Sequence, residues 1–298
     1  MSNLINEIVE FLKNSGFDCS IQTDSDLAVI CTRALDGHHN KVILPLEVTA
    51  TSYEDALEHA LQAHHSIRQF HSEHEEYPLI ITLDRWRTQT EMMKARILAH
   101  LEVFSPIYAR NCEVRKIDRT QAKEFLELHH SYGYAACKYC YGLFFKRHTG
   151  HIAMNAIPYE PGTLMAVATF SNARKWTKGD QVIRSYEWTR YASLPQVRLS
   201  GGMGRLLKIF IKEVQPDDIM SYADLEWSTG EVYRQLGFEL EGQKSPVTFT
   251  IDKQTWKRVP LTTRTTGDAS PKVPTHSQDL YFQNFGSNKY RLKLTDYK

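Results

Sequence analysis

The segment YEWTRYASLPQVRLSGGMGRLLKIFI, residues 186–211, decides the fold of the second half of the chain. A strand leads into a basic, glycine-rich turn, and the apolar spacing then predicts a helix over about 203–213. The first N–H groups of a helix lack intrahelical partners and, with the helix dipole, favour an anion. This order therefore predicts a phosphate-binding site.

Glycines and arginines at this turn fit that purpose. Gly201, Gly202 and Gly204 allow a close approach of the backbone to a ligand, and Arg198 and Arg205 add positive charge. The spacing differs from the P-loop, which needs Gly-Lys-Ser/Thr, and from the Gly-x-Gly-x-x-Gly dinucleotide fingerprint. The turn alone therefore predicts anion binding without identifying the ligand.

A second segment, SYADLEWSTGEVYRQLGFEL at residues 221–240, follows the helix. Strand, glycine loop, helix, strand and a short helix ending in Tyr-x-x-Leu-Gly-Phe resemble the GNAT (Gcn5-related N-acetyltransferase) fold. The resemblance implies that the loop binds the pyrophosphate of acetyl-coenzyme A or another acyl-coenzyme A. It also implies that Tyr233 reprotonates the leaving thiolate. The implied cofactor-binding residues are Arg198, Gly201, Gly202, Met203, Gly204 and Arg205.

A narrower resemblance covers about residues 107–294. The motifs IYARNCEVRKI, FLELHHSYGY, YGLFF and YFQNFGSNKYRLKL, in order with the two segments above, are similar to a GNAT-like domain of phage proteins. That domain is found fused behind nucleases of the homing-endonuclease type, and it is similar to the Mom DNA-adenine modification acyltransferases. The resemblance implies an amine acceptor on a nucleic-acid base or a protein.

Acyl transfer to an amine needs a base, an oxyanion donor and an acid. Glu187 is the candidate base, a strand N–H within residues 188–190 is the candidate donor, and Tyr233 is the candidate acid. A salt bridge with Arg184 or Arg190 is the alternative role for Glu187. Packing in the core is the alternative for Tyr233.

Polar residues flanking these elements are candidates for a substrate cleft. His130 matches a histidine of the phage-domain pattern. Asp224, Glu226 and Ser228 lie between a strand and a helix, at the edge of the expected cleft, where they are candidates for substrate binding. Asp224 and Ser228 have capping of the 230–236 helix as their alternative role. The predicted cleft residues are His130, Arg190, Asp224 and Ser228.

The cysteines predict neither a disulfide framework nor a metal site. Five cysteines in 298 residues favour a reducing, cytoplasmic environment. Cys137-x-x-Cys140 lies near His129 and His130 but is a weak match to a zinc site, which needs four suitably placed ligands. No metal is therefore predicted, and zinc at these residues stays an open alternative.

Charge is distributed unevenly along the chain. Residues 1–110 hold 9 Lys and Arg against 16 Asp and Glu, a difference of −7, whereas residues 111–298 hold 27 against 19, a difference of +8. The basic half is suited to a phosphate-bearing ligand or a polyanion. The expected organisation is an α/β module at 1–102, a connector at 103–111, a GNAT-like domain at 112–259, a flexible segment at 260–277 and a strand-like extension at 278–298.

The first module follows the order α-β-β-β-α-β-α. This order is weakly similar to the cores of restriction-endonuclease-like nucleases, which hold Mg²⁺ with acidic residues on the second and third strands. Asp26 begins the second strand and Glu47 ends the third, but the lysine of the nuclease motif is absent. A degenerate relative serving as a binding or assembly module is expected. Glu7 and Glu10 in the first apolar stretch argue against a signal peptide, and no apolar run predicts a membrane span.

The sequence thus predicts a two-domain α/β (α+β) protein whose second domain is an N-acyltransferase using an acyl-coenzyme A. One alternative is a nucleic-acid-binding protein with a nuclease remnant, in which the basic half binds DNA or RNA and the GNAT-like domain is non-catalytic. A third hypothesis is a GNAT-like domain that only binds its ligand. The sequence does not identify the acceptor.

Overall fold

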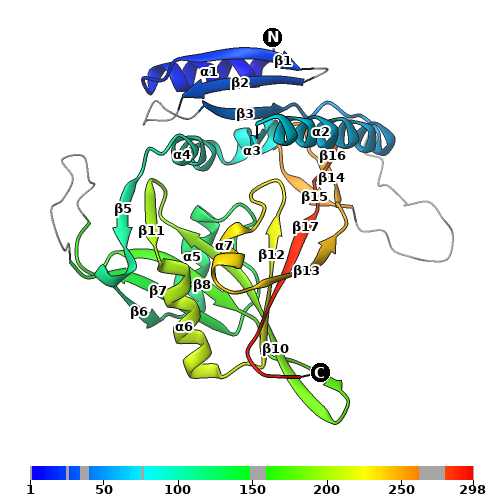
Figure 1. The fold of residues 1–298 in the computed structure, drawn as a ribbon. Coiled ribbons are helices and arrows are strands. Elements are labelled where there is room, and N and C mark those ends of the chain that lie inside the picture. Colours follow the sequence, from blue (N-terminus) through cyan, green and yellow to red (C-terminus); the bar gives the residue numbers. More distant parts are fainter. Residues whose placement is uncertain are drawn as a thin grey trace. The chain divides into compact units, whose positions relative to one another are not determined.

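The computed structural model describes residues 2–24, 27–33, 40–74, 77–147, 159–261 and 279–297. The chain forms two compact units of helices and strands (Figure 1). Unit 1 contains Met1–Glu102, Asp224–Ser228 and Lys244–Ser287, and unit 2 contains Val103–Ala223, Thr229–Gln243 and Asn288–Lys298. Both units combine helices and sheets, which confirms the predicted α/β class.

Unit 1 begins with a helix and a four-stranded mixed sheet. The elements are α1 (Asn3–Asn14), β1 (Cys19–Asp24), β2 (Leu27–Arg33), β3 (Asn40–Leu46), α2 (Tyr53–His74) and β4 (Leu79–Thr82). The strands lie in the order β1-β2-β3-β4, and only the β3–β4 pair is parallel, because α2 connects these two strands. The apolar face of α1 is buried as its helical spacing predicts. Asp26, which the sequence places at the start of the second strand, lies outside the described residues.

The rest of unit 1 differs from the sequence prediction. The last helix of the predicted α-β-β-β-α-β-α order is two helices, α3 (Leu83–Thr88) and α4 (Thr90–His100), separated at Gln89. Unit 1 also contains a three-stranded sheet that the sequence analysis did not predict. In it, β14 (Thr248–Ile251) pairs with both β15 (Arg258–Pro260) and β16 (Leu280–Gln283). Residues 244–259, which the prediction assigned to the second domain, therefore group with unit 1.

A network of buried charges joins distant parts of the sequence within unit 1. The Arg258 guanidinium donates to both carboxylate oxygens of Asp84 and of Glu226. Arg85 Nε donates to Glu226 Oε1 at 2.6 Å, and Arg96 Nη2 donates to the Glu226 main-chain carbonyl at 2.9 Å. Asp84 and Glu226 are each only 1% exposed. These contacts tie the five-residue segment Asp224–Ser228 to strands and helices more than 30 residues away in sequence.

The charge network determines the protonation of Glu226. Burial by itself raises the pKa of Glu226, but the guanidinium groups of Arg258 and Arg85 outweigh burial and lower this pKa to about 2. Glu226 is therefore ionised in the folded protein at every pH above about 2. Removing one partner of a buried ion pair leaves an uncompensated charge and costs about 3–5 kcal/mol.

Unit 2 is built on an eight-stranded sheet among the described residues. The strand order is β13-β17-β12-β10-β8-β7-β6, and β9 pairs with β10 beside this path. A separate parallel pair joins β5 and β11. The elements are β5 (Ser105–Tyr108), η1 (Ala109–Asn111), β6 (Cys112–Lys116), α5 (Arg119–His129), β7 (Tyr139–Phe145), β8 (Leu164–Phe170), β9 (Arg174–Lys178), β10 (Gln181–Ser193), β11 (Val197–Ser200), α6 (Gly202–Val214), β12 (Asp218–Asp224), α7 (Glu231–Gln235), β13 (Glu239–Lys244) and β17 (Ser287–Lys293).

Helices α5 and α6 cover opposite faces of this sheet. Ala166, Ala168 and Phe170 of β8 pack in the cluster that contains α6, whereas the intervening Val167 packs in the cluster that contains α5. Phe170 stacks on Phe210 of α6 with ring centroids 3.8 Å apart. The predicted strand-turn-helix of residues 186–211 is thus anchored by an aromatic core.

The predicted extension at residues 278–298 is divided between the units, because β16 pairs with β14 in unit 1 whereas β17 joins the sheet of unit 2. Helix α5 is capped by Asp118, which accepts a hydrogen bond from Gln121 N at 2.8 Å. Residues 262–277 of the predicted flexible segment lie outside the described residues.

Replacing Glu226 with glutamine should destabilise the protein by about 3–5 kcal/mol at neutral pH, since it removes the negative charge that the buried guanidinium groups of Arg85 and Arg258 share. The pKa of Glu226 is lowered by folding, from an ordinary value of 4.5 to about 2. Its contribution to stability is therefore complete above the unfolded pKa and is lost as the pH falls toward about 2. Urea unfolding from neutral to acidic pH should show a steeper loss of stability in the wild type than in Glu226→Gln.

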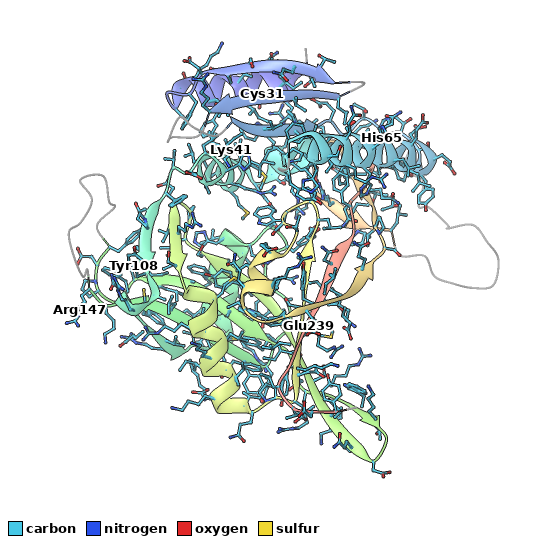
Figure 2. The ribbon with its side chains drawn as sticks, viewed as in Figure 1. Cys31, Lys41, His65, Tyr108, Arg147 and Glu239 are labelled. Carbon is cyan, nitrogen blue, oxygen red and sulfur yellow. The ribbon has the colours of Figure 1, made fainter. Side chains whose placement is uncertain are left out.

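Glu239→Gln is the matched control, because Glu239 is an exposed residue of β13 (labelled in Figure 2). This variant should keep both the stability and the pH profile of the wild type. Equal unfolding free energies for Glu226→Gln and the wild type would contradict a structural role for the charge network.

Candidate active site

The parallel ladder between β10 and β12 is short. It joins Ser185 to Asp218, Tyr186 to Ile219 and Glu187 to Met220, and it ends there. From Trp188 onward β10 pairs with β8, and this register shifts between Trp188 and Arg190. Thr189 is therefore the extra residue of a β-bulge and faces no residue of β8 in this ladder.

Side chains bind the main-chain carbonyls at this bulge. Trp188 Nε1 donates to the Arg190 carbonyl at 3.1 Å, and Arg190 Nη1 donates to the Thr189 carbonyl at 2.8 Å. The Ser221 hydroxyl of β12 lies 3.0 Å from the Trp188 carbonyl oxygen. Since buried carbonyls require donors, these contacts hold the irregular backbone in place.

Tyr233 of α7 reaches the same point. The Ser221 hydroxyl lies 2.8 Å from the Tyr233 hydroxyl oxygen. A hydroxyl carries one proton, so when Ser221 gives its proton to the Trp188 carbonyl, Tyr233 becomes the donor to Ser221. Burial raises the pKa of Tyr233, which keeps this phenol protonated at neutral pH.

The Tyr233 ring is also part of an aromatic cluster. It stacks on Tyr290 with ring centroids 5.4 Å apart. It also makes T-shaped contacts with Phe238 and Trp188, with centroid distances of 5.5 Å and 6.2 Å. The ring therefore packs in the core, which is the alternative role that the sequence analysis gave to Tyr233. Its hydroxyl is hydrogen-bonded at the end of the β10–β12 ladder.

Glu187 lies on the opposite face of β10 from Trp188, because side chains alternate along a strand. Arg184 forms its ion pair with Asp217 at 3.3 Å, and Arg190 Nε donates to the Gly133 carbonyl at 3.0 Å. Within the described part of the chain no ion pair or hydrogen bond to the Glu187 carboxylate is found. Burial lowers the pKa of Arg190, and the negative charge of Glu187 opposes this change.

The glycine turn begins α6 as the sequence predicts. Gly201 adopts φ +78°, a left-handed conformation that favours glycine. The Arg205 N–H donates to the Gly201 carbonyl, which is the first bond of the helix. The preceding N–H groups, on Gly202, Met203 and Gly204, have no acceptor within the helix. They form a group of donors at a positive helix end.

Two of the glycines also have a packing reason. A Cβ on Gly202 would lie 3.0 Å from Leu199 Cβ and 3.3 Å from the Tyr191 hydroxyl, and one on Gly204 would lie 3.2 Å from Leu236. Substituting Gly202 would therefore disturb the seating of α6 on β10. A carboxylate placed there would test folding as well as ligand binding.

Three arginines surround the turn. Arg205 Nη1 donates to the Ala109 carbonyl at 2.8 Å, and the Arg198 guanidinium lies 5.1 Å from the Phe104 ring centroid. The third, Arg110, was missed by the sequence analysis: β5 pairs Tyr108 with Ser200, so Arg110 comes beside the turn. The Arg110 guanidinium lies 4.5 Å from the ring of Tyr108, which is 50% exposed and labelled in Figure 2.

The four predicted cleft residues are divided between the two units. Arg190 bonds to Gly133 in the turn that follows His130, and His130 Nδ1 accepts from Tyr132 N at 3.1 Å. Asp224 and Ser228 instead belong to unit 1, where the Asp224 carbonyl accepts from Ser228 N at 2.8 Å. The structure also excludes both as caps of α7, whose N-cap is Gly230.

The cysteine pair lies in unit 2, at the start of β7. Cys137 Sγ is 3.3 Å from Cys140 Sγ and 3.4 Å from the Tyr134 hydroxyl oxygen, and both cysteines are free thiols. Burial raises the pKa of Cys140 to about 12. Among the described residues no group of three potential metal ligands is found, and no helix there is long and apolar enough to span a bilayer.

No protein-family model matches the chain, and no curated protein is significantly similar to it. One similar solved structure is a conserved protein of unknown function from Enterococcus faecalis V583, a probable N-acyltransferase, with 16% identity and a TM-score of 0.33 over 50% of this chain. Another is a GNAT-family acetyltransferase from Bacillus anthracis, with 13% identity and a TM-score of 0.29 over 61% of this chain and 95% of that one. This chain spans 36% of the Enterococcus protein, and similarities of this size do not assign it to a family.

Proposed function

We propose that unit 2 is an N-acyltransferase that moves an acyl group from an acyl-coenzyme A, such as acetyl-coenzyme A, to an amine. The observation that carries the proposal is the hydrogen-bonded chain from Tyr233 through Ser221 to the Trp188 carbonyl, at the point where the β10–β12 ladder ends. The glycine turn packs against Tyr191, three residues further along β10. An anion site and a proton donor therefore occur along the same strand.

The turn supplies groups that suit a pyrophosphate. The N–H groups of residues 202–204 point out of a helix start, and a phosphate there gains from both hydrogen bonding and the helix dipole. Arg198 and Arg110 are exposed side chains near this turn, and guanidinium groups bind phosphate oxygens in a bidentate manner. Tyr108 offers an exposed ring on which an adenine base can stack.

The thioester supplies the acyl group and a thiol leaving group, and the protein handles the protons. In this proposal Glu187 takes a proton from the amine nitrogen as the C–N bond forms. Tyr233 gives its proton to the sulfur as the C–S bond breaks. The Ser221 hydroxyl then donates to the phenol oxygen in place of the Trp188 carbonyl, which stabilises the phenolate. The N–H groups at the Thr189 bulge are suited to stabilising negative charge on the carbonyl oxygen.

Coenzyme A should bind to the intact protein, and Arg198→Gln should weaken this binding roughly tenfold, because one charge-assisted contact to phosphate is lost. Isothermal titration at low and high salt measures both effects. Arg119→Gln is the control: Arg119 is also exposed, but it lies on α5, which covers the other face of the sheet. No binding by the wild type at millimolar ligand, or equal losses in both variants, would refute the anion site.

Tyr233→Phe should lower turnover about 10²–10⁴-fold, the usual contribution of a positioned acid, and should leave coenzyme A affinity unchanged. Thiol release from acetyl-coenzyme A with an amine acceptor measures the rate. Tyr290→Phe is the control, since Tyr290 stacks on Tyr233 but its hydroxyl donates to the Thr229 carbonyl at 2.8 Å. If the two variants lose activity equally, packing of the aromatic cluster explains the loss and Tyr233 is not the acid.

A basic ribbon favours a nucleic-acid acceptor. Strand β9 pairs with the first half of β10, and it carries exposed Arg174, Lys175 and Lys178. Trp176, between these cations, packs edge-on against Tyr297 with centroids 5.5 Å apart. Cations along an antiparallel ribbon suit a phosphate backbone, whose binding is strongly salt-dependent. The alternative, a unit that only binds nucleic acid, uses the same ribbon.

Arg174→Gln combined with Lys178→Gln should reduce DNA and RNA binding. The slope of the logarithm of the binding constant against the logarithm of the salt concentration should become less steep by about one for each lost phosphate contact. Fluorescence anisotropy against salt concentration measures this. Lys123→Gln combined with Lys208→Gln, on α5 and α6, conserves the change in net charge and should have little effect. Unchanged binding in the ribbon variant would remove β9 from the acceptor site.

A further inference from the structure

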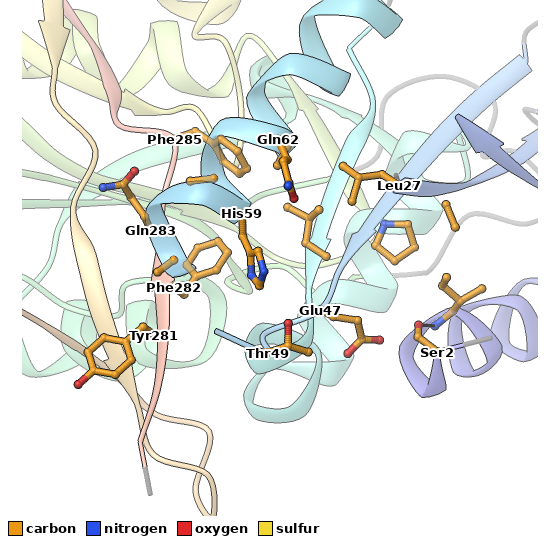
Figure 3. A pocket seen from close by; sticks show the side chains of 17 residues that line it. Ser2, Leu27, Glu47, Thr49, His59, Gln62, Tyr281, Phe282, Gln283 and Phe285 are labelled. Atoms are coloured by element: carbon orange, nitrogen blue, oxygen red, sulfur yellow. Dashed lines mark hydrogen bonds between the residues drawn. The ribbon is translucent and has the colours of Figure 1, made fainter. Parts of the chain in front are cut away.

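Unit 1 contains a pocket of about 330 Å³, and none of its lining residues is among the groups assigned to acyl transfer. Its walls come from α1, the ends of β2 and β3, one face of α2, and β16 (Figure 3). Ala56, Ala60 and Ala63 of α2 face it at helical spacing, and their small side chains leave the space open. A volume of this size is at the lower end of small-molecule sites.

The pocket holds a carboxylate that has no partner within the part of the chain that the structure describes. Glu47, directly after β3, is half-buried and lines the pocket, and its Oε1 is sealed from solvent with no hydrogen-bond donor among the described residues. The described side chains that line the pocket include neither lysine nor arginine. Arg87, on which Glu47 exerts some electrostatic effect, is already bound through two hydrogen bonds to Glu7. A half-buried carboxylate that lines a pocket and has no described donor on either oxygen favours a cationic partner, which would approach the part of the side chain that faces the pocket.

The remaining walls suit a hydrocarbon body. Phe282 and Phe285 lie on the β16 side, and Ile5 and Leu27 lie on the side of α1 and β2. Aromatic rings hold both apolar groups and adjacent cations. His59 and Gln62 on α2 and Thr49 near Glu47 add a few polar groups at the rim (Figure 3).

We infer that this pocket is a binding site for a small organic ammonium compound, whose cationic nitrogen pairs with Glu47 and whose apolar or aromatic body fills the space against Phe282 and Phe285. The inference does not depend on acyl transfer, because every residue that carries it belongs to unit 1. The ligand is recognised by one positive charge and a compact hydrocarbon part.

The test uses the full chain and two probes of nearly equal shape, 2-phenylethylamine and 2-phenylethanol. Calorimetry or ligand-observed NMR at millimolar concentration should detect the amine, and the neutral alcohol should bind roughly tenfold or more weakly, since it lacks the charge-assisted contact. Glu47→Gln keeps the shape of the side chain and should weaken binding of the amine by a similar factor. The variant would then bind the amine and the alcohol with equal affinity.

Glu58→Gln is the matched control, because Glu58 is an exposed residue of α2 outside the lining of the pocket. It should bind the amine as the wild type does. The melting temperature of each unliganded variant shows whether folding is intact. Equal binding of amine and alcohol by the wild type, no binding of the amine, or an unchanged affinity in Glu47→Gln would each overturn the inference.

Discussion

The end of the parallel ladder between β10 and β12 is the constraint on which the proposed site depends. If the ladder continued beyond Glu187 and Met220, the main-chain groups of residues 188–190 would bond to β12. The Ser221 hydroxyl of β12, which contacts the Trp188 carbonyl, takes the place of that pairing. One hydroxyl thus connects the backbone of β10 with a phenol on α7. The proposed arrangement of catalytic groups begins with that interruption of regular structure.

Aromatic packing explains why the interruption is stable. Trp188, Tyr233, Phe238 and Tyr290 contact one another at the ladder's end, and each buries a large apolar area. The polar atoms of the tyrosines are hydrogen-bonded, so the cluster satisfies its donors while it fills the core. The same residues that stabilise unit 2 therefore position the proposed acid, and for this reason matched Tyr→Phe variants are needed to separate the two roles.

Unit 1 is organised by a different principle. Its sheet could be assembled from residues 1–102, but Asp84 and Arg85 are neutralised by Arg258 and Glu226, which come from much later in the chain. Buried charges of this kind specify which segments come together, because each is costly without its partner. A module that looks continuous in the sequence is therefore completed by two distant segments. The pocket beside Glu47 has the same origin, since β16 supplies one of its walls.

The sequence by itself determined the local elements that have a strong period or a clear signal. The strand-turn-helix of residues 186–211, the apolar face of α1 and the glycine at the start of α6 follow from short-range geometry, which neighbouring residues specify. Only the tertiary structure decided the pairings: β16 and β17 lie in different sheets, Arg110 comes beside the glycine turn through β5, and Glu226 meets Arg258. The physical reason is that strand alternation marks a buried face without naming its partner, and buried charges reveal their counter-ions only when the chain is folded.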